Sequence, residues 1–87
     1  MEQRSLHEIC RDIRKHWVNA KGPSVYFGAV PYLEAMEYIA TGGNDHGDYG
    51  LDTAESIVIY FLSNAATFRG PEAKAIKAEL KRKYGIK

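Results

Sequence analysis

Three glycine-containing dipeptides interrupt the chain and divide it into four segments, each with its own apolar pattern. They are Gly22-Pro23, Gly42-Gly43 and Gly70-Pro71. Glycine and proline break regular structure because glycine populates conformations closed to other residues and proline has no backbone N–H group to donate. A chain of 87 residues can bury one modest core, so we expect residues 1–87 to form a single domain.

The first and last segments have the patterns of amphipathic helices. In the first segment, apolar residues recur at steps of three and four: Leu6, Ile9, Cys10, Ile13 and Trp17. A capping box formed by Ser5 and Glu8 precedes them, and together these features predict a helix over residues 6–18. The last segment opens with Pro71, which suits the first turn of a helix, and it predicts a helix over residues 71–83.

The two middle segments also predict helices. Pro31 and an apolar stripe opposite Glu34 and Glu37 indicate a helix over residues 29–40, while residues 25–27 are compatible with a short strand. Residues 56–62 are β-prone, but a capping signal at residues 52–55 and the length of the run favour a helix over residues 53–66. Because this helix is apolar on nearly all sides, we expect an all-α fold, a compact bundle of about four helices around a buried third helix.

Charge is distributed unevenly along the chain. Residues 1–25 carry a net charge of +2, residues 26–68 carry −6 with no Lys or Arg, and residues 69–87 carry +5, giving +1 in total. In one interpretation, the basic ends fold back on the acidic middle and neutralise it. In the other, the molecule presents a separate patch of each sign, and each patch can steer a partner.

Cysteine content and hydropathy indicate the compartment. The single cysteine, Cys10, cannot form an intrachain disulfide, which fits a reducing environment. The N-terminus has no apolar stretch of signal-peptide length, and the longest apolar run is too short to span a bilayer. We therefore expect a cytoplasmic protein with no membrane partner.

Several stretches of the chain match the pattern of a known group of proteins. The stretches are residues 25–36 (VYFGAVPYLEAM), residues 56–65 (SIVIYFLSNA), Phe68-Arg69-Gly70 and residues 77–81 (KAELK). Together they resemble small uncharacterised proteins encoded by bacteriophages and prophages, over most of residues 6–81 but not in the glycine-rich loop. The resemblance implies an accessory protein that acts in the host bacterial cytoplasm, and it carries no known activity and no assigned site residues.

Residues 41–51 form the longest irregular segment, and such a loop often carries function. In the register of an EF-hand, five residues of this region fall at ligand positions: Asn44, His46, Asp48, Asp52 and Glu55. The register fails because Asn replaces the first Asp and Tyr49 stands where the sharp turn needs Gly. Histidine is also a poor ligand for a hard cation, so calcium binding is a weak interpretation of the loop.

Metal and catalytic chemistry have little support in the sequence. His7 and Cys10 have a usable helical spacing for a transition metal, but Cys10 lies on the apolar face, where cysteine is usually a small core residue. His46 between Asp45 and Asp48 resembles a general base, yet the chain has no nucleophile elbow, phosphate loop or dinucleotide fingerprint. We therefore expect no enzymatic activity, no metal and no cofactor.

Protein binding is the function that the composition favours. The chain has more aromatic residues than a small core needs: Trp17, Tyr26, Phe27, Tyr32, Tyr38, Tyr49 and Tyr60. Trp and Tyr are the usual anchors of protein interfaces, and exposed apolar surface is also compatible with a homo-oligomer. We expect a protein partner of unknown identity to dock on residues 44–52, with Asp45, His46 and Asp48 around Tyr49 as the anchor.

Nucleic-acid binding is the alternative. It would use the basic residues of the predicted C-terminal helix and the turn before it: Arg69, Lys74, Lys77, Lys81 and Arg82. A basic C-terminal helix is also ordinary, because cations stabilise that end of the helix dipole. The helix lacks Asn and Gln to read base edges, and its first residues, Pro71-Glu72-Ala73, are poor base readers.

Overall fold

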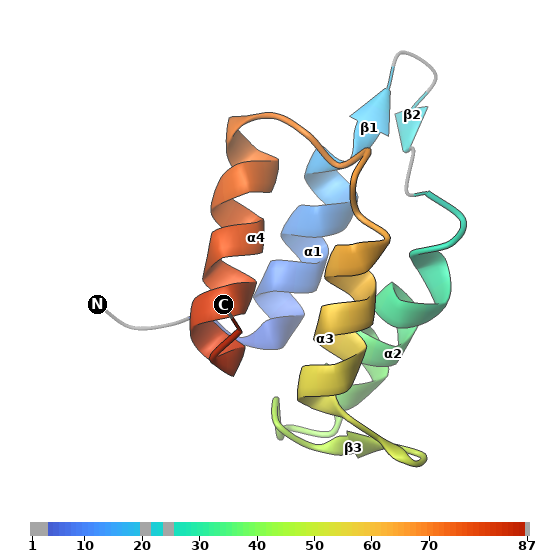
Figure 1. Cartoon of the computed structure of the whole chain (residues 1–87), viewed down its shortest axis with the longest axis vertical. Coiled ribbons are helices and arrows are strands. Elements are labelled where there is room, and N and C mark those ends of the chain that lie inside the picture. Colours follow the sequence, from blue (N-terminus) through green and yellow to red (C-terminus); the bar gives the residue numbers. More distant parts are fainter. Residues whose placement is uncertain (1–3, 20–21, 24–25, 87) are drawn as a thin grey trace.

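The computed structural model describes residues 4–19, 22–23 and 26–86. Its four helices are α1 (Leu6–His16), α2 (Val30–Thr41), α3 (Ala54–Ser63) and α4 (Pro71–Tyr84), which confirms the predicted all-α class. α1 packs against α2 and α4, and α3 also packs against both of these helices. α2 and α4 thus lie at opposite sides of the bundle (Figure 1). No helix in the described part of the chain is long and apolar enough to cross a bilayer.

Local capping signals set the start of α1. The Ser5 hydroxyl accepts a hydrogen bond from the Glu8 backbone N–H at 3.3 Å, and the Ser5 backbone N–H donates to the Glu8 carboxylate at 3.4 Å. The helix ends at His16, two residues before the predicted end. Trp17 leaves the helical conformation, and β1 (Val18–Asn19) then pairs antiparallel with β2 (Gly22–Pro23). The chain therefore reverses direction in the region where the sequence predicted a turn.

α3 is shorter than the sequence predicted, at both ends. Thr53 is the N-cap, and its hydroxyl accepts a hydrogen bond from the Ser56 backbone N–H at 3.2 Å. At the other end, the Ser63 hydroxyl and the Asn64 side-chain amide donate to the carbonyls of Ile59 and Tyr60, at 3.0 and 2.9 Å. Such side-chain bonds compete with the helical pattern, and Asn64 adopts a non-helical conformation.

The burial of α3 is one-sided rather than all-round. Ile57, Val58 and Phe61 lie in the core, whereas Ile59 and Tyr60 are 44% and 47% exposed. The three other short helices cannot cover every side of α3, because a chain of this size buries too little of its surface. An apolar outer face therefore remains on α3.

The boundaries of α2 and α4 lie within one residue of the predictions. α4 begins at Pro71 after Gly70, whose φ is 108°, and it ends before Gly85, whose φ is 66°. Left-handed conformations of this kind favour glycine, which fixes both ends of the helix. The possible strand at residues 25–27 falls partly outside the described residues, and residues 26–27 belong to no strand.

The glycine-rich segment is less irregular than predicted. Its second half forms a hairpin of β3 (Asp48–Tyr49) and β4 (Asp52–Thr53), at the end of the bundle where α2 stops and α3 begins (Figure 1). Gly50 occupies the first central position of the turn with a φ of 63°. Glycine at that position is typical of the tight two-residue turns that match the twist of a hairpin.

Candidate docking surface

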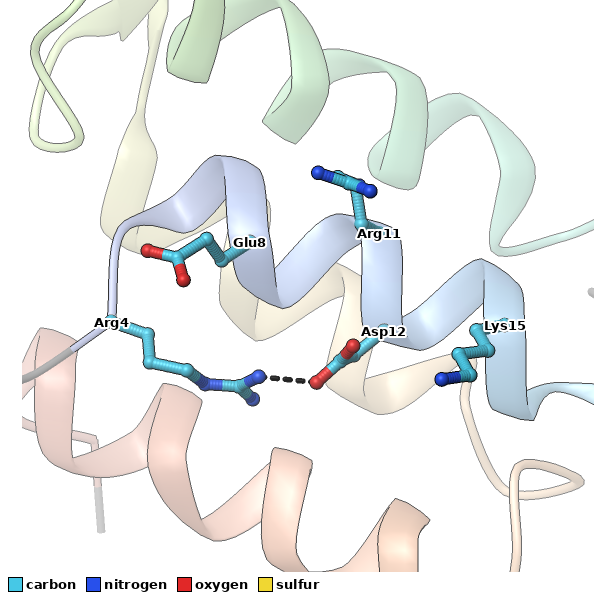
Figure 2. A pocket seen from close by; sticks show the side chains of 5 residues that line it. All are labelled: Arg4, Glu8, Arg11, Asp12 and Lys15. Atoms are coloured by element: carbon cyan, nitrogen blue, oxygen red, sulfur yellow. Dashed lines mark hydrogen bonds and ion pairs between the residues drawn. The ribbon is translucent and has the colours of Figure 1, made fainter.

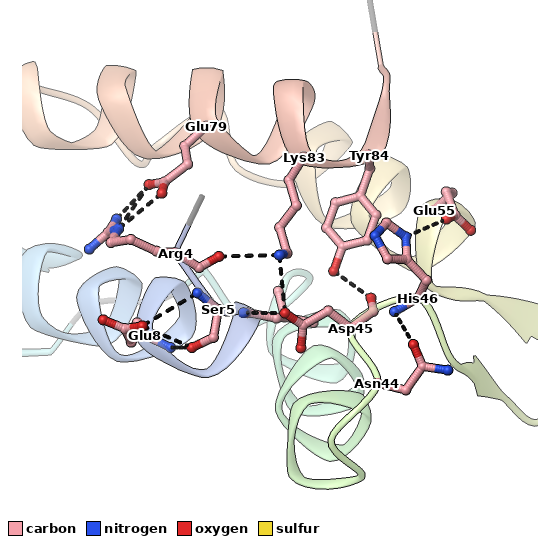
Figure 3. A network of polar contacts seen from close by, with 11 residues as sticks. Arg4, Ser5, Glu8, Asn44, Asp45, His46, Glu55, Glu79, Lys83 and Tyr84 are labelled. Carbon is pink, nitrogen blue, oxygen red and sulfur yellow. Dashed lines mark hydrogen bonds and ion pairs between the residues drawn. The ribbon is translucent and has the colours of Figure 1, made fainter. Parts of the chain in front are cut away.

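The first half of the glycine-rich loop is anchored to the bundle by Asp45. Its carboxylate accepts a hydrogen bond from the Leu6 backbone N–H at 2.9 Å and lies 3.1 Å from the Lys83 ammonium nitrogen. The Tyr84 hydroxyl donates to the Asp45 carbonyl at 2.7 Å (Figure 3). Asp45 thus connects the start of α1 to the end of α4, and its negative charge complements the N-terminus of α1.

The electrostatics of this anchor favour an ionised carboxylate. Burial opposes ionisation of Asp45, but the Leu6 amide and the Lys83 ammonium outweigh it and lower the pKa of the carboxyl group. The Lys83 side chain is only 8% exposed, and its ammonium also donates to the Arg4 carbonyl at 3.2 Å. Asp45, predicted to surround the Tyr49 anchor, is instead engaged by Leu6 and Lys83 and stabilises the fold.

His46 also has a structural partner. Its Nδ1 lies 3.0 Å from the Glu55 carboxylate, and its backbone N–H donates to the Asn44 side chain at 3.1 Å. The ring stands edge-on to Tyr84, with 5.0 Å between centroids. The hydrogen bond from His46 lowers the pKa of Glu55. The carboxylate beside the imidazole is therefore that of Glu55, rather than Asp45 or Asp48 as the sequence suggested.

A second ion-pair cluster fixes the N-terminal segment. The Arg4 guanidinium donates to the Glu79 carboxylate on α4, at 2.6 Å from Nη2, and also pairs with Asp12 on α1. These hydrogen bonds lower the pKa values of both Asp12 and Glu79. The cluster thus ties α1 to α4 on the side of the bundle opposite α2.

We expect the free energy of unfolding to fall as the pH is lowered below about 5. Four carboxyl groups have lower pKa values in the folded chain than their ordinary values: Asp12, Asp45, Glu55 and Glu79. The unfolded chain therefore binds more protons in acid. The stabilisation is complete above the ordinary values of 3.8 and 4.5, and it is lost as the pH falls through the folded values. Urea unfolding at a series of pH values measures it.

Two variants test whether these four carboxyl groups cause the loss of stability in acid. Glu79→Gln removes one of the four groups, so its free energy of unfolding should depend less steeply on pH. Glu34→Gln is the matched control, because Glu34 is exposed and has no ion pair within the described residues. A free energy of unfolding that does not change with acid would contradict the assignment.

The exposed aromatic residues of α2 and the hairpin lie together. Tyr38 and Tyr49 are 66% and 42% exposed, and their rings meet edge-on with 5.4 Å between centroids. Asp52 is the cross-strand neighbour of Tyr49, and Glu34 precedes Tyr38 by one helical turn. Asp48 and Leu51 are exposed in the same hairpin. We call the exposed residues of this region the acidic-aromatic face: Glu34, Tyr38, Asp48, Tyr49, Leu51 and Asp52.

Other aromatic pairs lie outside the acidic-aromatic face, and of their members Tyr32 is partly buried. Tyr32 of α2 and Tyr60 of α3 approach each other with 5.6 Å between centroids, and Tyr26 and Phe27 form another pair at 5.0 Å. Phe27 is 80% exposed. Exposed apolar groups of this kind are typical of interaction surfaces when they gather on one side of a small domain.

Charge neutralisation between the ends and the middle of the chain is partial. Arg14 pairs with Glu37 at 2.6 Å, and Lys83 pairs with Asp45, so each basic end contributes one such contact. Glu34, Asp48 and Asp52 have no ion-pair partner among residues 4–19, 22–23 and 26–86. Separate acidic and basic patches therefore remain on the folded surface.

The basic residues predicted as a nucleic-acid site lie on α4 and just before it. Arg69, Lys74, Lys81 and Arg82 are exposed, whereas Lys77 is half-buried. The Lys77 ammonium stands over the Phe68 ring, 5.8 Å from its centroid. α4 lies across the bundle from α2 of the acidic-aromatic face, whereas the hairpin of that face lies at the end of the bundle (Figure 1).

The candidate metal ligands do not come together. Cys10 is buried in the core, and burial raises the pKa of its thiol to about 12, so it is a poor ligand and nucleophile. His7 is exposed on α1, and His46 and Glu55 of the EF-hand register pair with each other. Within the described residues, no group of three or more His, Cys, Asp or Glu side chains is placed to hold a metal ion.

Two clefts on the surface are large enough to receive a small ligand. One, of about 290 Å³, runs along α1 and is lined only by charged side chains: Arg4, Glu8, Arg11, Asp12 and Lys15 (Figure 2). The other, of about 390 Å³, lies where α3 ends and is lined by Tyr26 and small polar or apolar residues. The first lacks the apolar walls that small-molecule sites usually have, and neither contains a catalytic pair.

No protein-family model, curated protein or solved structure matches this chain. Tyr38 lies outside residues 44–52, the site predicted from the sequence, and Leu51 lies within that range but was not named as a contact. The signal for Tyr38 was its place on the outer side of an amphipathic helix, where a large aromatic residue is unusual.

Proposed function

We propose that this chain is a phage or prophage accessory protein without catalytic activity of its own, which binds a protein partner through the acidic-aromatic face. The observation that carries the proposal is the Tyr38–Tyr49 pair, which is exposed beside carboxylates and belongs to residues 26–68, a stretch of the sequence without Lys or Arg. Two rings that already pack together lose little freedom on binding, which makes them suitable anchors. The phage setting, in the cytoplasm of the host bacterium, rests on the sequence resemblance.

The chemistry of the face defines the partner. Asp48, Asp52 and Glu34 supply negative charge, so the partner should present Lys or Arg side chains. Tyr38 and Tyr49 can receive an apolar anchor or a guanidinium over the ring face. We therefore expect a basic segment of a host or phage protein that carries at least one aliphatic or aromatic side chain.

We expect the partner to be lost when the anchors are removed. Affinity capture from a nuclease-treated bacterial lysate identifies the partner, and titration with the purified partner then gives the dissociation constant. Tyr38→Ala combined with Tyr49→Ala should weaken binding about tenfold or more, because paired aromatic residues dominate such interfaces. Reversal of charge at Asp48 and Asp52 to Lys should slow association and remove its salt dependence.

Phe27→Ala is the matched control, since Phe27 is a more exposed aromatic residue outside the acidic-aromatic face. It should leave the dissociation constant unchanged. A partner that binds the charge-reversed variant as well as it binds the native chain would show that the docking surface lies elsewhere. Circular dichroism of each variant establishes that the fold is retained.

A further inference from the structure

Basic side chains form a line along one side of α4. Lys74, Lys77 and Lys81 are spaced by three and four residues, so they share a face and extend over about 10 Å of the helix axis. Arg69 continues the line just before the helix. We call these four residues the basic stripe. The acidic residues of α4, Glu72 and Glu79, are seven apart on the side that faces α1, where Glu79 binds Arg4.

The positive charges of the stripe are not compensated within the described residues. None of the four side chains has a carboxylate within ion-pair distance there, and the ammonium of Lys77 has the Phe68 ring as its neighbour. Burial, together with the positive charges of Arg69 and Lys81, lowers the pKa of Lys77. Like charges are thus held close together, and a bound anion would relieve their repulsion.

The stripe lacks the anchors that a protein partner needs. Apart from its basic side chains, the exposed side of α4 carries small residues such as Ala75 and Ala78, and Phe68 beneath the stripe is buried. Protein interfaces depend on aromatic and large apolar anchors, which gather instead on the acidic-aromatic face. A row of point charges without such anchors fits the phosphates of a nucleic-acid backbone.

The side chains of the basic stripe and its surroundings fit a duplex better than a single strand. Proteins that bind single strands stack bases on exposed aromatic rings, and neither α4 nor residues 64–70 expose one. The stripe has no Asn or Gln to read adenine, and contacts from Lys and Arg to phosphates carry no sequence information, so binding through the backbone should not depend on sequence. The part of the acidic-aromatic face on α2 lies across the bundle from α4, so its carboxylates do not line the approach of a duplex to the stripe (Figure 1).

We propose that the basic stripe binds the sugar-phosphate backbone of duplex DNA without sequence preference, as a second docking face beyond the protein-binding function. The probe is a short fluorescent duplex of arbitrary sequence, titrated with the full chain at several salt concentrations. Four phosphate contacts predict that log affinity falls with log salt with a slope of about −3 to −4. Replacing Lys77 and Lys81 by Gln should reduce the slope by about 2 and weaken binding at least about tenfold at about 0.1 M salt.

The matched control removes the same charge from another helix. Arg11→Gln with Lys15→Gln, on α1, should leave the slope unchanged. The proposal is overturned if the duplex does not bind at low salt, if the two double variants lose equal slope, or if a single strand of the same length binds more tightly. The Tyr38→Ala and Tyr49→Ala variant should bind the duplex like the native chain, so failure of this proposal and failure of the protein-docking proposal are distinguishable.

Discussion

Replacing Trp17 by Ala should lower the free energy of unfolding by about 3–5 kcal/mol. Trp17 is almost completely buried where α1 ends; it stacks on Phe68 at 4.9 Å between centroids and meets Phe61 edge-on at 6.0 Å. One side chain thereby joins α1 to α3 and to the connection that leads into α4. Because domains of this size have a total stability of about 4–13 kcal/mol, this loss is at least about a quarter of the total.

Urea unfolding followed by far-ultraviolet circular dichroism measures this effect, since Trp17 is the only tryptophan and its fluorescence is lost in the variant. Tyr60→Ala is the matched control, because it removes an aromatic residue that is nearly half exposed. We expect that control to cost less than about 1 kcal/mol. Equal losses in the two variants would mean that the three-ring cluster does not organise the core.

Where local signals decide the structure, the sequence predicted it well. The Ser5–Glu8 capping box and Pro71 each act on residues within one helical turn, and α1 and α4 begin where those residues predict. The amphipathic pattern of α1 also identified its buried residues, because a stripe at steps of three and four has one inward side.

Where distant contacts decide the structure, the sequence was less informative. α1 ends early because Trp17 turns to stack on Phe68, a contact across most of the chain. The apolar run of α3 predicted all-round burial, but the number of neighbouring helices decides how many of its sides are covered. The sequence did not predict the hairpin of β3 and β4, because its strands are only two residues long.

The predicted site likewise combines local signals, which the sequence shows, with distant contacts, which it does not. Tyr49 was identified correctly as an exposed aromatic residue, but its contact with Tyr38 joins two elements and has no local signal. Asp45 was assigned to the docking surface with Asp48, since both are acidic residues of one loop. The bonds that set them apart come from Leu6 and Lys83, near the two ends of the chain.

Asp45→Ala should therefore lower the free energy of unfolding by about 2–4 kcal/mol. The substitution leaves the Leu6 amide at the start of α1 without its acceptor, and it leaves the nearly buried Lys83 ammonium without its counter-charge. An unpaired buried cation costs more than the lost attraction alone, because its water shell is not restored. Urea unfolding at neutral pH measures the loss.

Asp48→Ala is the matched control in the same loop, and it should change the free energy of unfolding by less than about 0.5 kcal/mol, because Asp48 is exposed and unpaired within the described residues. Asp45→Asn keeps an acceptor for the Leu6 amide but no charge for Lys83, so its stability should lie between those of Asp45→Ala and the native chain. If Asp48→Ala were as destabilising as Asp45→Ala, the loop would be fixed as a whole rather than by one residue. The expected order instead assigns stability to Asp45 and leaves Asp48 and Tyr49 free to contact a partner.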